Sequence, residues 1–233
     1  MSIAENVLRV KKNIALAAER SGRAPSKVLL CAATKMNSAD RVREAIEAGV
    51  DICGENRVQE LCEKNAAGAY EGCPLHFIGH LQKNKVKFVV GTAALIHSVD
   101  SVELAEKIDA AAKKLGIRQD ILLEVNIGNE EAKSGFAPGE LIAAAEKISH
   151  FSSVQVRGLM AIPPICASPE ENRPYFAQMK QLFIDIGAKK YDNIRMDFLS
   201  MGMSADYETA IEEGANIVRV GTGIFGARDY GTK

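Results

Sequence analysis

Hydrophobic and polar positions along the chain follow two patterns that alternate from one end to the other. Eight short stretches are almost continuously apolar, which is typical of strands in a parallel sheet that is covered by helices. The stretches between them are amphipathic or rich in alanine, which predicts helices. The predicted strands are Val28–Ala33, Asp51–Gly54, Leu75–Ile78, Leu95–Val99, Asp120–Asn126, Val154–Met160, Arg195–Ser200 and Asn216–Val220. The predicted helices are Ala39–Ala48, Asn56–Ala67, Gln82–Val90, Val102–Leu115, Pro138–Ser149, Glu170–Ile186 and Ala205–Glu213.

The number and order of these units favour a barrel. Eight strands, with a helix after each of the first seven, predict an α/β fold of the (β/α)8 TIM barrel type. The chain of 233 residues contains no linker-like segment, so we expect a single domain over residues 1–233. An extra N-terminal helix is predicted, because Met1 to Arg20 has helical spacing and Ser2 with Glu5 forms a capping box. A doubly wound open sheet is the alternative, but the first strand lacks the glycine-rich dinucleotide turn of that fold.

Two of the units resemble each other in sequence. Ser38-Ala-Asp40 and Ser204-Ala-Asp206 each precede an amphipathic stretch, and we expect both to supply the residues that cap a helix start. Gly49 and Gly214 follow the two stretches, where each is expected to end its helix. The similarity is either a trace of repeated β/α units or two solutions to one local problem.

Composition narrows the class of protein. The chain has 29 basic and 30 acidic residues and a formal charge of −1, and this balance argues against binding to nucleic acid or to a membrane surface. We find neither a signal peptide nor an apolar stretch long enough to span a bilayer. The five cysteines are odd in number and lack the spacing of a disulfide framework, so we expect reduced thiols in the cytoplasm.

One cluster has the residue types of a metal site. Cys73, His76 and His80 offer three possible ligands over eight positions. They lie across a predicted strand, and no fourth ligand is evident nearby. We therefore predict no metal site.

Lys35 is the first candidate for chemistry, because it closes an almost wholly apolar run, Lys27-Val-Leu-Leu-Cys-Ala-Ala-Thr-Lys35. In a barrel the functional groups lie at the C-terminal ends of the strands, so Lys35 is expected at that mouth. A lysine amine in apolar surroundings loses some of its preference for the charged form, and a neutral amine can form a Schiff base with an aldehyde. The alternative is that Lys35 lays its stem over the strand end and keeps its ammonium in water.

The last two strands are followed by loops suited to phosphate. These loops are Ser200-Met-Gly-Met-Ser204 and Gly221-Thr-Gly223, and both are rich in glycine and hydroxyl groups. Glycine lets backbone N–H groups approach phosphate oxygens, and hydroxyls add further donors. The loops after strands seven and eight often form a phosphate site in TIM barrels, so the two loops together predict such a site.

A lysine amine and a phosphate site in one barrel mouth suit pyridoxal phosphate (PLP), which carries both an aldehyde and a phosphate. Arg219 lies two residues before Gly221 on the last strand. A cation that keeps its charge beside the pyridine nitrogen would leave that nitrogen unprotonated and weaken the ring as an electron sink. The alternative for Arg219 is an ion pair with a barrel carboxylate such as Glu55 or Glu124.

Six ordered motifs resemble one known family over nearly the whole chain. They are Ala33-Thr-Lys35, Gly54-Glu-Asn-Arg-Val-Gln-Glu60, His76-Phe-Ile-Gly-His-Leu-Gln-Lys-Asn-Lys85, Gly158-Leu-Met160, Leu199-Ser-Met-Gly-Met-Ser204, and Val218-Arg-Val-Gly-Thr222 with Phe225-Gly226. The chain resembles the pyridoxal phosphate homeostasis proteins, also called proline synthase co-transcribed proteins, which are similar to the N-terminal barrel of alanine racemase. One departure is Met36-Asn37, where the family pattern has other residues after the lysine.

The resemblance implies a PLP barrel of fold type III and assigns a set of cofactor-binding residues. Lys35 would carry the cofactor as a Schiff base, and Arg219 would contact the pyridine nitrogen. Phosphate contacts would come from Ser200, Gly221 and Thr222. The residues implied near the ring are Asn56 and Met160.

Three functions are compatible with this site. The first is a PLP-binding protein of intracellular homeostasis that holds, buffers or delivers the cofactor, with PLP-dependent apo-enzymes as candidate partners. The second is an amino-acid racemase or a related weak carbanion enzyme. The third is an enzyme in which Lys35 acts on a carbonyl sugar without a cofactor.

The racemase interpretation meets a physical problem, because two-base racemisation needs a second proton donor on the opposite face of the substrate. In alanine racemase that donor comes from a second domain, for which we see no counterpart in this sequence. We therefore expect a monomeric binding protein with no strong catalysis and no assigned catalytic residue.

Overall fold

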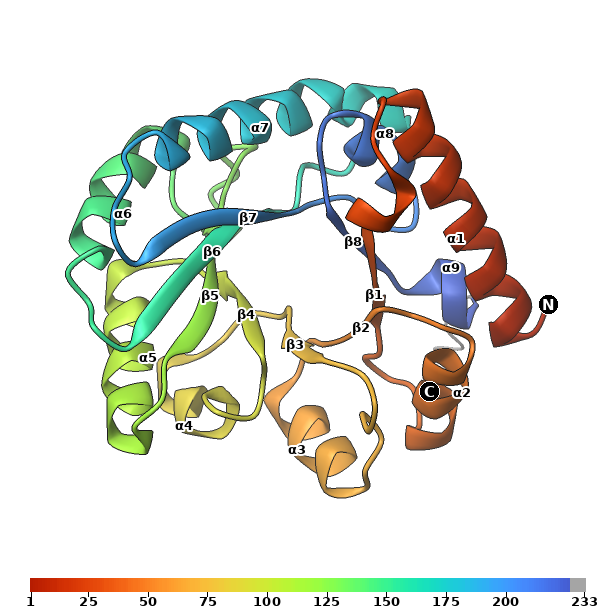
Figure 1. Ribbon diagram of the computed structural model, residues 1–233, viewed down its shortest axis with the longest axis horizontal. Coiled ribbons are helices and arrows are strands. Elements are labelled where there is room, and N and C mark those ends of the chain that lie inside the picture. The colour runs from red at the N-terminus through yellow and green to blue at the C-terminus, as the bar shows by residue number, and fades with distance from the viewer. Residues whose placement is uncertain (227–233) are drawn as a thin grey trace.

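Eight parallel strands close into a barrel in sequence order, from β1 to β8 and back to β1, as Figure 1 shows. The structure is a computed structural model, and it describes residues 1–226. The strands are β1 (Leu29–Ala33), β2 (Ile52–Glu55), β3 (Leu75–Phe77), β4 (Leu95–Val99), β5 (Gln119–Val125), β6 (Val154–Ala161), β7 (Ile194–Ser200) and β8 (Ile217–Val220). The predicted TIM barrel is therefore confirmed, and the open-sheet alternative is wrong.

Helices surround the ring of strands on the outside (Figure 1). They are α1 (Ile3–Arg20), α2 (Ala39–Glu47), α3 (Val58–Ala66), α4 (Val86–Val89), α5 (Val102–Leu115), α6 (Leu141–Ile148), α7 (Arg173–Gly187), α8 (Tyr207–Glu212) and α9 (Thr222–Phe225). Short 3-10 turns η1 (Pro25–Lys27), η2 (Lys83–Lys85), η3 (Pro138–Glu140) and η4 (Pro169–Asn172) precede β1, α4, α6 and α7. One turn of helix, α9, follows β8 and was not predicted from the sequence.

The helix starts show which local predictions were right. Ser2 and Glu5 form the expected capping box at the start of α1, and Ser38 accepts a hydrogen bond from the Arg41 N–H at the start of α2. The expected cap of α8 is wrong, because Asp206 occupies the N-cap position without a side-chain cap bond. Ser204 lies two residues earlier, and its hydroxyl bonds to another loop instead.

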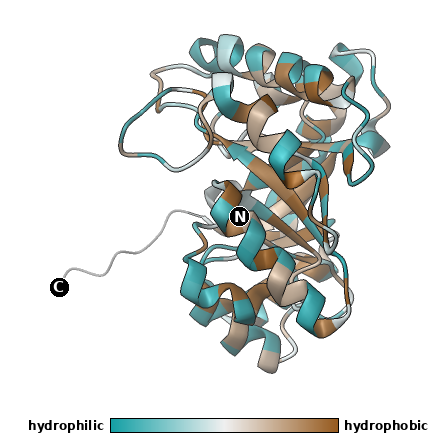
Figure 2. Ribbon diagram, turned by 90° about the vertical axis from the view of Figure 1, so that its left-hand side faces the viewer, coloured by the Kyte–Doolittle hydropathy of each residue, from teal (hydrophilic) through white to brown (hydrophobic). Residues whose placement is uncertain are grey.

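The barrel has two apolar cores. The larger one lies between the strands and the helices, and the smaller one fills the inside of the barrel. The inner core consists of Cys31, Ile52, Ile78, Leu95, Leu122, Met160 and Ile217. Figure 2 shows the hydrophobic strands enclosed by helices whose outer faces are more hydrophilic. Since side chains alternate along a strand, the inward positions of one strand lie level with those of its neighbours.

The seam between β7 and β8 is the least regular part of the barrel. Only Ser200 and Ile217 are in register there. Asn216 spans the seam below them, because its side chain accepts a hydrogen bond from the Leu199 N–H at 2.7 Å and donates to the Asp197 carbonyl at 2.6 Å. Above the pair, the Arg219 N–H donates to the Gly202 carbonyl at 3.0 Å. The two predicted phosphate loops therefore leave the barrel from the same seam.

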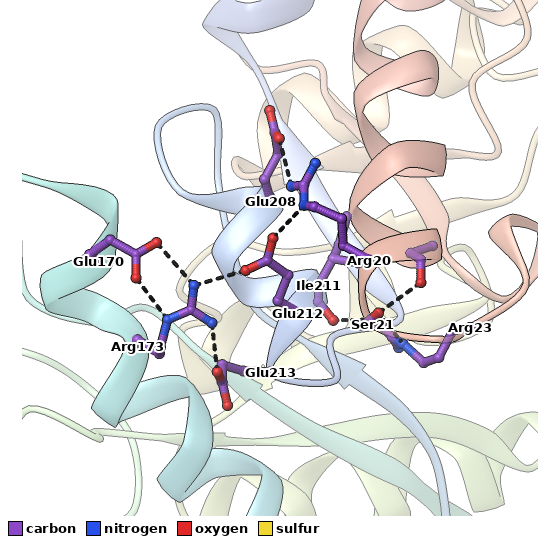
Figure 3. Close-up of polar contacts among 10 residues, drawn as sticks. Arg20, Ser21, Arg23, Glu170, Arg173, Glu208, Ile211, Glu212 and Glu213 are labelled. Atoms are coloured by element: carbon purple, nitrogen blue, oxygen red, sulfur yellow. Dashed lines mark hydrogen bonds and ion pairs between the residues drawn. The ribbon is translucent and has the colours of Figure 1, made fainter.

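Charged side chains fasten α1 and α7 to α8, as Figure 3 shows. Arg20 on α1 pairs with Glu208 and Glu212 at 3.0 and 2.8 Å. Arg173 on α7 reaches the same Glu212 at 2.8 Å and Glu213 at 2.7 Å. These side chains are partly exposed, so each pair contributes little alone, but the shared Glu212 joins three helices. The network fixes the helix that follows the loop ending at Ser204.

Candidate functional site

The predicted site residues lie at the C-terminal ends of neighbouring strands. Cys31 on β1 is level with Arg219 on β8, and Ala33 is level with Gly54 on β2. On the other side of the barrel, Met160 on β6 is level with Ser200 on β7. Because all strands are parallel, the residues that follow them meet at one mouth of the barrel. The fold therefore brings Lys35, Asn56, Met160, Ser200, Arg219, Gly221 and Thr222 to that mouth.

Lys35 is half-buried in the loop after β1. Thr34, immediately before it, is fully buried, and its hydroxyl donates to the Gly54 carbonyl or the Glu55 carboxylate at 3.1 and 3.0 Å. Gly221 lies against the same strand end, since a Cβ added to it would be 3.5 Å from the Ala33 Cβ. Lys35 is thus flanked by β2 on one side and by the loop after β8 on the other.

Arg219 is a buried cation inside the barrel, with 5% of its surface exposed. Its Nη1 donates to the Ser200 hydroxyl at 2.7 Å, and its Nη2 donates to the Ala161 carbonyl at 2.9 Å. Burial lowers the pKa of the Arg219 guanidinium, although an arginine still keeps its charge. Within residues 1–226 no carboxylate lies within 4 Å of Arg219, so the alternative of an ion pair with Glu55 or Glu124 is wrong.

Two buried histidines continue the chain of hydrogen bonds from Arg219. The Ser200 hydroxyl lies 3.0 Å from His97 Nδ1, and His97 Nε2 lies 2.9 Å from His76 Nδ1. Burial lowers the pKa of His76 to about 4, and burial together with His76 and Arg219 lowers that of His97 as well. Both rings are therefore neutral at neutral pH. One set of tautomers is consistent with all of these contacts: Ser200 donates to His97 Nδ1, and His97 Nε2–H donates to His76 Nδ1.

The sequence prediction named His76 only as a possible metal ligand and within a family motif, and it did not name His97, although a signal was present. His76 and His97 interrupt apolar strands at inward positions, where a polar residue needs a buried partner. Ser200 was expected to face a phosphate. The structure places it below the loops, fully buried, with its hydroxyl between Arg219 and His97.

Ser204 joins the two glycine-rich loops. Its hydroxyl accepts hydrogen bonds from the backbone N–H groups of Gly221 and Gly223, both at 3.2 Å. Gly202 makes the approach possible, since its φ is +88° and an added Cβ would lie 2.5 Å from the Ala210 Cβ. Thr222, between the two glycines, is exposed. Two N–H groups thus converge on one oxygen, which is the arrangement that binds anions in backbone nests.

A cavity of about 290 Å³ with both polar and apolar side chains in its lining adjoins Asn56 on the far side of the mouth. Asn56 is held by close packing, because an added Cβ on Gly79 would lie 2.0 Å from the Asn56 carbonyl oxygen. The buried Oδ1 of Asn56 has no hydrogen-bond partner among the described residues. Glu124 also lines the cavity, and burial, with the nearby charge of Asp100, raises the pKa of its carboxyl to about 7. Among residues 1–226, this side of the mouth therefore has a buried polar atom, the Asn56 Oδ1, that lacks a hydrogen-bond partner.

The three candidate metal ligands have separate contacts. His76 pairs with His97, and His80 lies 3.2 Å from the Ser134 hydroxyl and 3.4 Å from the Asp100 carboxylate. Over the described part of the chain, no group of three or more histidines, cysteines or carboxylates is arranged to hold a metal ion.

None of the described helices is long and apolar enough to cross a membrane.

Sequence comparisons give one consistent set of relatives. Residues 6–229 match the family described as alanine racemase, N-terminal domain. The chain is 44% identical to a pyridoxal phosphate homeostasis protein of Aquifex aeolicus, with 99% of this chain and 100% of that protein covered. It is 41% identical to a protein of the same name from Pseudomonas aeruginosa, over 99% of this chain and 97% of the relative.

Solved structures share the barrel. PipY of Synechococcus elongatus with PLP bound matches with a TM-score of 0.81 and 36% identity, over 97% of this chain and 100% of that chain. An alanine racemase of Clostridium difficile matches with a TM-score of 0.73 and 17% identity, over 96% of this chain but 57% of that chain. At this low identity the second match shows a common fold alone.

Proposed function

This chain belongs to the pyridoxal phosphate homeostasis protein family, and from that premise we propose that it binds PLP to hold, buffer or deliver it rather than to catalyse a reaction. The observation that carries the proposal is the meeting of three features at one barrel mouth. These are the strand-end Lys35, the glycine loops that converge on Ser204, and a buried Arg219 that has no carboxylate within 4 Å among residues 1–226. PLP has an aldehyde, a phosphate and a ring nitrogen, one for each feature.

The residues at the mouth fit this cofactor. The N–H groups of Gly221 and Gly223 already share one oxygen acceptor, so phosphate oxygens suit the same place. The unsatisfied Oδ1 of Asn56 leaves a polar atom available to a ligand on the other side of Lys35. Met160 contributes an apolar side chain from the inner core, which suits contact with an aromatic ring.

Each residue then has a distinct task. PLP supplies an aldehyde that condenses reversibly with an amine and a ring that can accept electrons. Lys35 would hold the cofactor through its amine, while Gly221, Thr222 and Gly223 would hold the phosphate with the help of Ser204. In the sequence-based assignment Ser200 also binds phosphate. We now propose that Ser200 acts by fixing Arg219, since its hydroxyl is occupied by Arg219 and His97.

Arg219 favours binding of PLP over catalysis with it. A guanidinium keeps its proton at neutral pH, so Arg219 would donate to the ring nitrogen of bound PLP and leave that nitrogen unprotonated. An unprotonated ring draws electrons from an attached carbon less strongly, which disfavours carbanion chemistry. The neutral His97 and His76 behind Ser200 offer no proton that would change this state.

The described tyrosines do not supply the second base that a racemase needs. The Tyr70 hydroxyl donates to Glu55, and the Tyr207 hydroxyl accepts from Asn13. Burial raises the pKa of both phenols, which makes them poorer bases at neutral pH. Tyr175 and Tyr191 pack against the outer core, and Tyr230 lies outside the described residues. We therefore propose that the protein is not an enzyme.

The setting of this function is part of the proposal. The cysteines that the structure describes are all free thiols, which suits a reducing cytoplasm. We propose a monomer whose partners are PLP and, as recipients, PLP-dependent apo-enzymes.

The absorbance of an imine between Lys35 and PLP tests the proposal. The purified protein should show the visible absorbance of such an imine, and Lys35→Ala should lose it while keeping its far-UV circular dichroism. Lys83→Met is a matched control, because Lys83 is an exposed lysine paired with Glu103 on the outer surface. The proposal fails if Lys35→Ala keeps the imine absorbance.

Solvent deuterium exchange at Cα of amino acids tests the absence of catalysis. The PLP-loaded protein should exchange no faster than free PLP under the same conditions. Rapid exchange that disappears in Lys35→Ala would establish the racemase-like alternative.

A further inference from the structure

A buried cluster of charges lies beneath Lys35. Its centre is Lys64 on α3, a lysine with only 8% of its surface exposed. The ammonium donates to the Glu55 carboxylate at 2.7 Å, to the Glu60 carboxylate at 2.8 Å and to the Thr34 carbonyl at 2.8 Å. All three donors of the ammonium are used, so the side chain has one defined position.

The cluster holds the residues on both sides of Lys35. Thr34 precedes Lys35, and its carbonyl accepts from Lys64 while its hydroxyl donates toward Glu55. Met36 follows Lys35, and its N–H donates to Glu60 at 2.7 Å. Met36 has a φ of +62°, a left-handed conformation that a methionine adopts only when surrounding contacts impose it. The direction in which Lys35 leaves the backbone is therefore set through Lys64.

Such a cluster is a costly way to stabilise a barrel. Glu55 has no exposed surface, and taking a carboxylate and an ammonium out of water costs as much as their attraction returns. An apolar pair of the same size would support the fold equally well. What an apolar pair lacks is the directional contact to the Thr34 carbonyl and, through Glu60, to the Met36 N–H.

We propose that Lys64, with Glu55 and Glu60, is a positioning residue that orients the Lys35 amine toward the PLP aldehyde. The proposal rests on the function proposed above, because it gives Lys35 the covalent role. Lys64 touches neither the phosphate loops nor Arg219. It therefore governs how fast Lys35 forms and releases the covalent link, and leaves the binding of the phosphate and ring unchanged.

The test separates covalent from non-covalent binding. Pyridoxine 5′-phosphate carries the ring and phosphate but no aldehyde, so its affinity reports the non-covalent contacts alone. The rate of imine formation with PLP, followed by stopped-flow absorbance, reports the position of Lys35. A merely structural role for Lys64 would change both quantities together.

The main variant removes both charges at once. Lys64→Met alone leaves the Glu55 carboxylate buried without its cation, so the double variant Lys64→Met/Glu55→Gln is the better protein for kinetics. We expect imine formation about tenfold slower, because a misplaced reactive group lowers the rate steeply. The affinity for pyridoxine 5′-phosphate should stay within about twofold of the parent. Lys83→Met, which removes an exposed lysine, should change neither.

A second variant changes the partly exposed Glu60 and leaves the buried pair of Lys64 and Glu55 in place. Glu60→Ala removes the acceptor of the Met36 N–H, and the Glu60 side chain is partly exposed, so the fold should tolerate the change. Loss of this hydrogen bond should slow imine formation about threefold.

The outcomes distinguish this inference from the proposed function. Unchanged imine kinetics in Glu60→Ala and in the folded double variant would overturn the inference. Equal losses of imine formation and pyridoxine 5′-phosphate affinity would also overturn it. Failure of the proposed function would give a different result, namely imine absorbance that persists in Lys35→Ala.

Discussion

Two buried cations lie on opposite sides of Lys35, and their surroundings differ. Lys64 has two carboxylates and a carbonyl around its ammonium, at 2.7 to 2.8 Å. Arg219 has a serine hydroxyl and a carbonyl, and neutral histidines behind the serine. Lys64 thus forms direct ion pairs with carboxylates, whereas Arg219 has no carboxylate within 4 Å among residues 1–226 and interacts with Glu124 and Asp206 only at longer range. We infer that the first cation serves the fold and propose that the second is available to a ligand.

The largest effect is expected from removal of Lys64. Lys64→Met should lower the free energy of unfolding by about 3–5 kcal/mol, because Glu55 keeps a buried charge that has lost its partner. Urea unfolding followed by circular dichroism measures the change. The double variant Lys64→Met/Glu55→Gln should recover most of the loss. If the single variant is as stable as the parent, Lys64 does not neutralise the buried carboxylate.

Acid should lower the free energy of unfolding through His76, which lies on the Arg219 side of the mouth. The folded pKa of His76, about 4, lies below the value near 6.5 of an unfolded histidine, so the unfolded chain binds the proton more readily. Stability from this group is complete above pH 6.5 and is lost as the pH falls toward 4, by about 3 kcal/mol in all. His76→Gln should remove this part of the pH dependence.

The comparison of parent and variant is essential for this test. Glu124, whose pKa is raised to about 7, has the opposite sign, because its stabilising contribution is present at low pH and lost as the pH rises through 7. The difference in unfolding free energy between parent and His76→Gln, measured from pH 7 to pH 4.5, cancels the Glu124 contribution. A difference that does not vary with pH would show that His76 is not held neutral.

The smallest change in stability is expected at Arg219. Arg219→Leu breaks no ion pair within 4 Å among the described residues, but it leaves the buried Ala161 carbonyl without its donor, so the free energy of unfolding should fall by about 1–3 kcal/mol. The affinity for pyridoxine 5′-phosphate should nevertheless fall by about tenfold or more, since a buried charged donor to the ring is lost. Isothermal titration calorimetry measures the affinity. A large loss of stability with unchanged affinity would show that Arg219, like Lys64, serves the fold rather than ligand binding.

Most of the barrel could be predicted from the sequence because its strands are buried on both faces. Leu95–Val99 and Val102–Leu115 agree with the predicted bounds at both ends. The short helix α9 was missed because four residues give no periodicity, and the start of the predicted Gln82–Val90 helix is a 3-10 turn. Such ends depend on tertiary contacts rather than on local pattern.

The sequence predicts those site residues whose place is determined by the end of a strand. Lys35, Arg219 and the two glycine loops follow from their positions in a β/α repeat. The partners of these residues do not, because Lys64, His97 and Ser204 come from elements far apart in sequence whose side chains meet only in the closed barrel. Ser204 illustrates the limit: its position suggested a helix cap, and only the seam between β7 and β8 brings Gly221 and Gly223 to its hydroxyl.

We propose above that Lys35 is the residue that carries PLP. Reduction of the PLP-loaded protein with sodium borohydride, followed by protease digestion and peptide mass spectrometry, tests it most directly. We expect one phosphopyridoxyl group per chain, located on the peptide that contains Lys35. Labelling on other lysines with Lys35 unmodified, or no labelling at all, would contradict it.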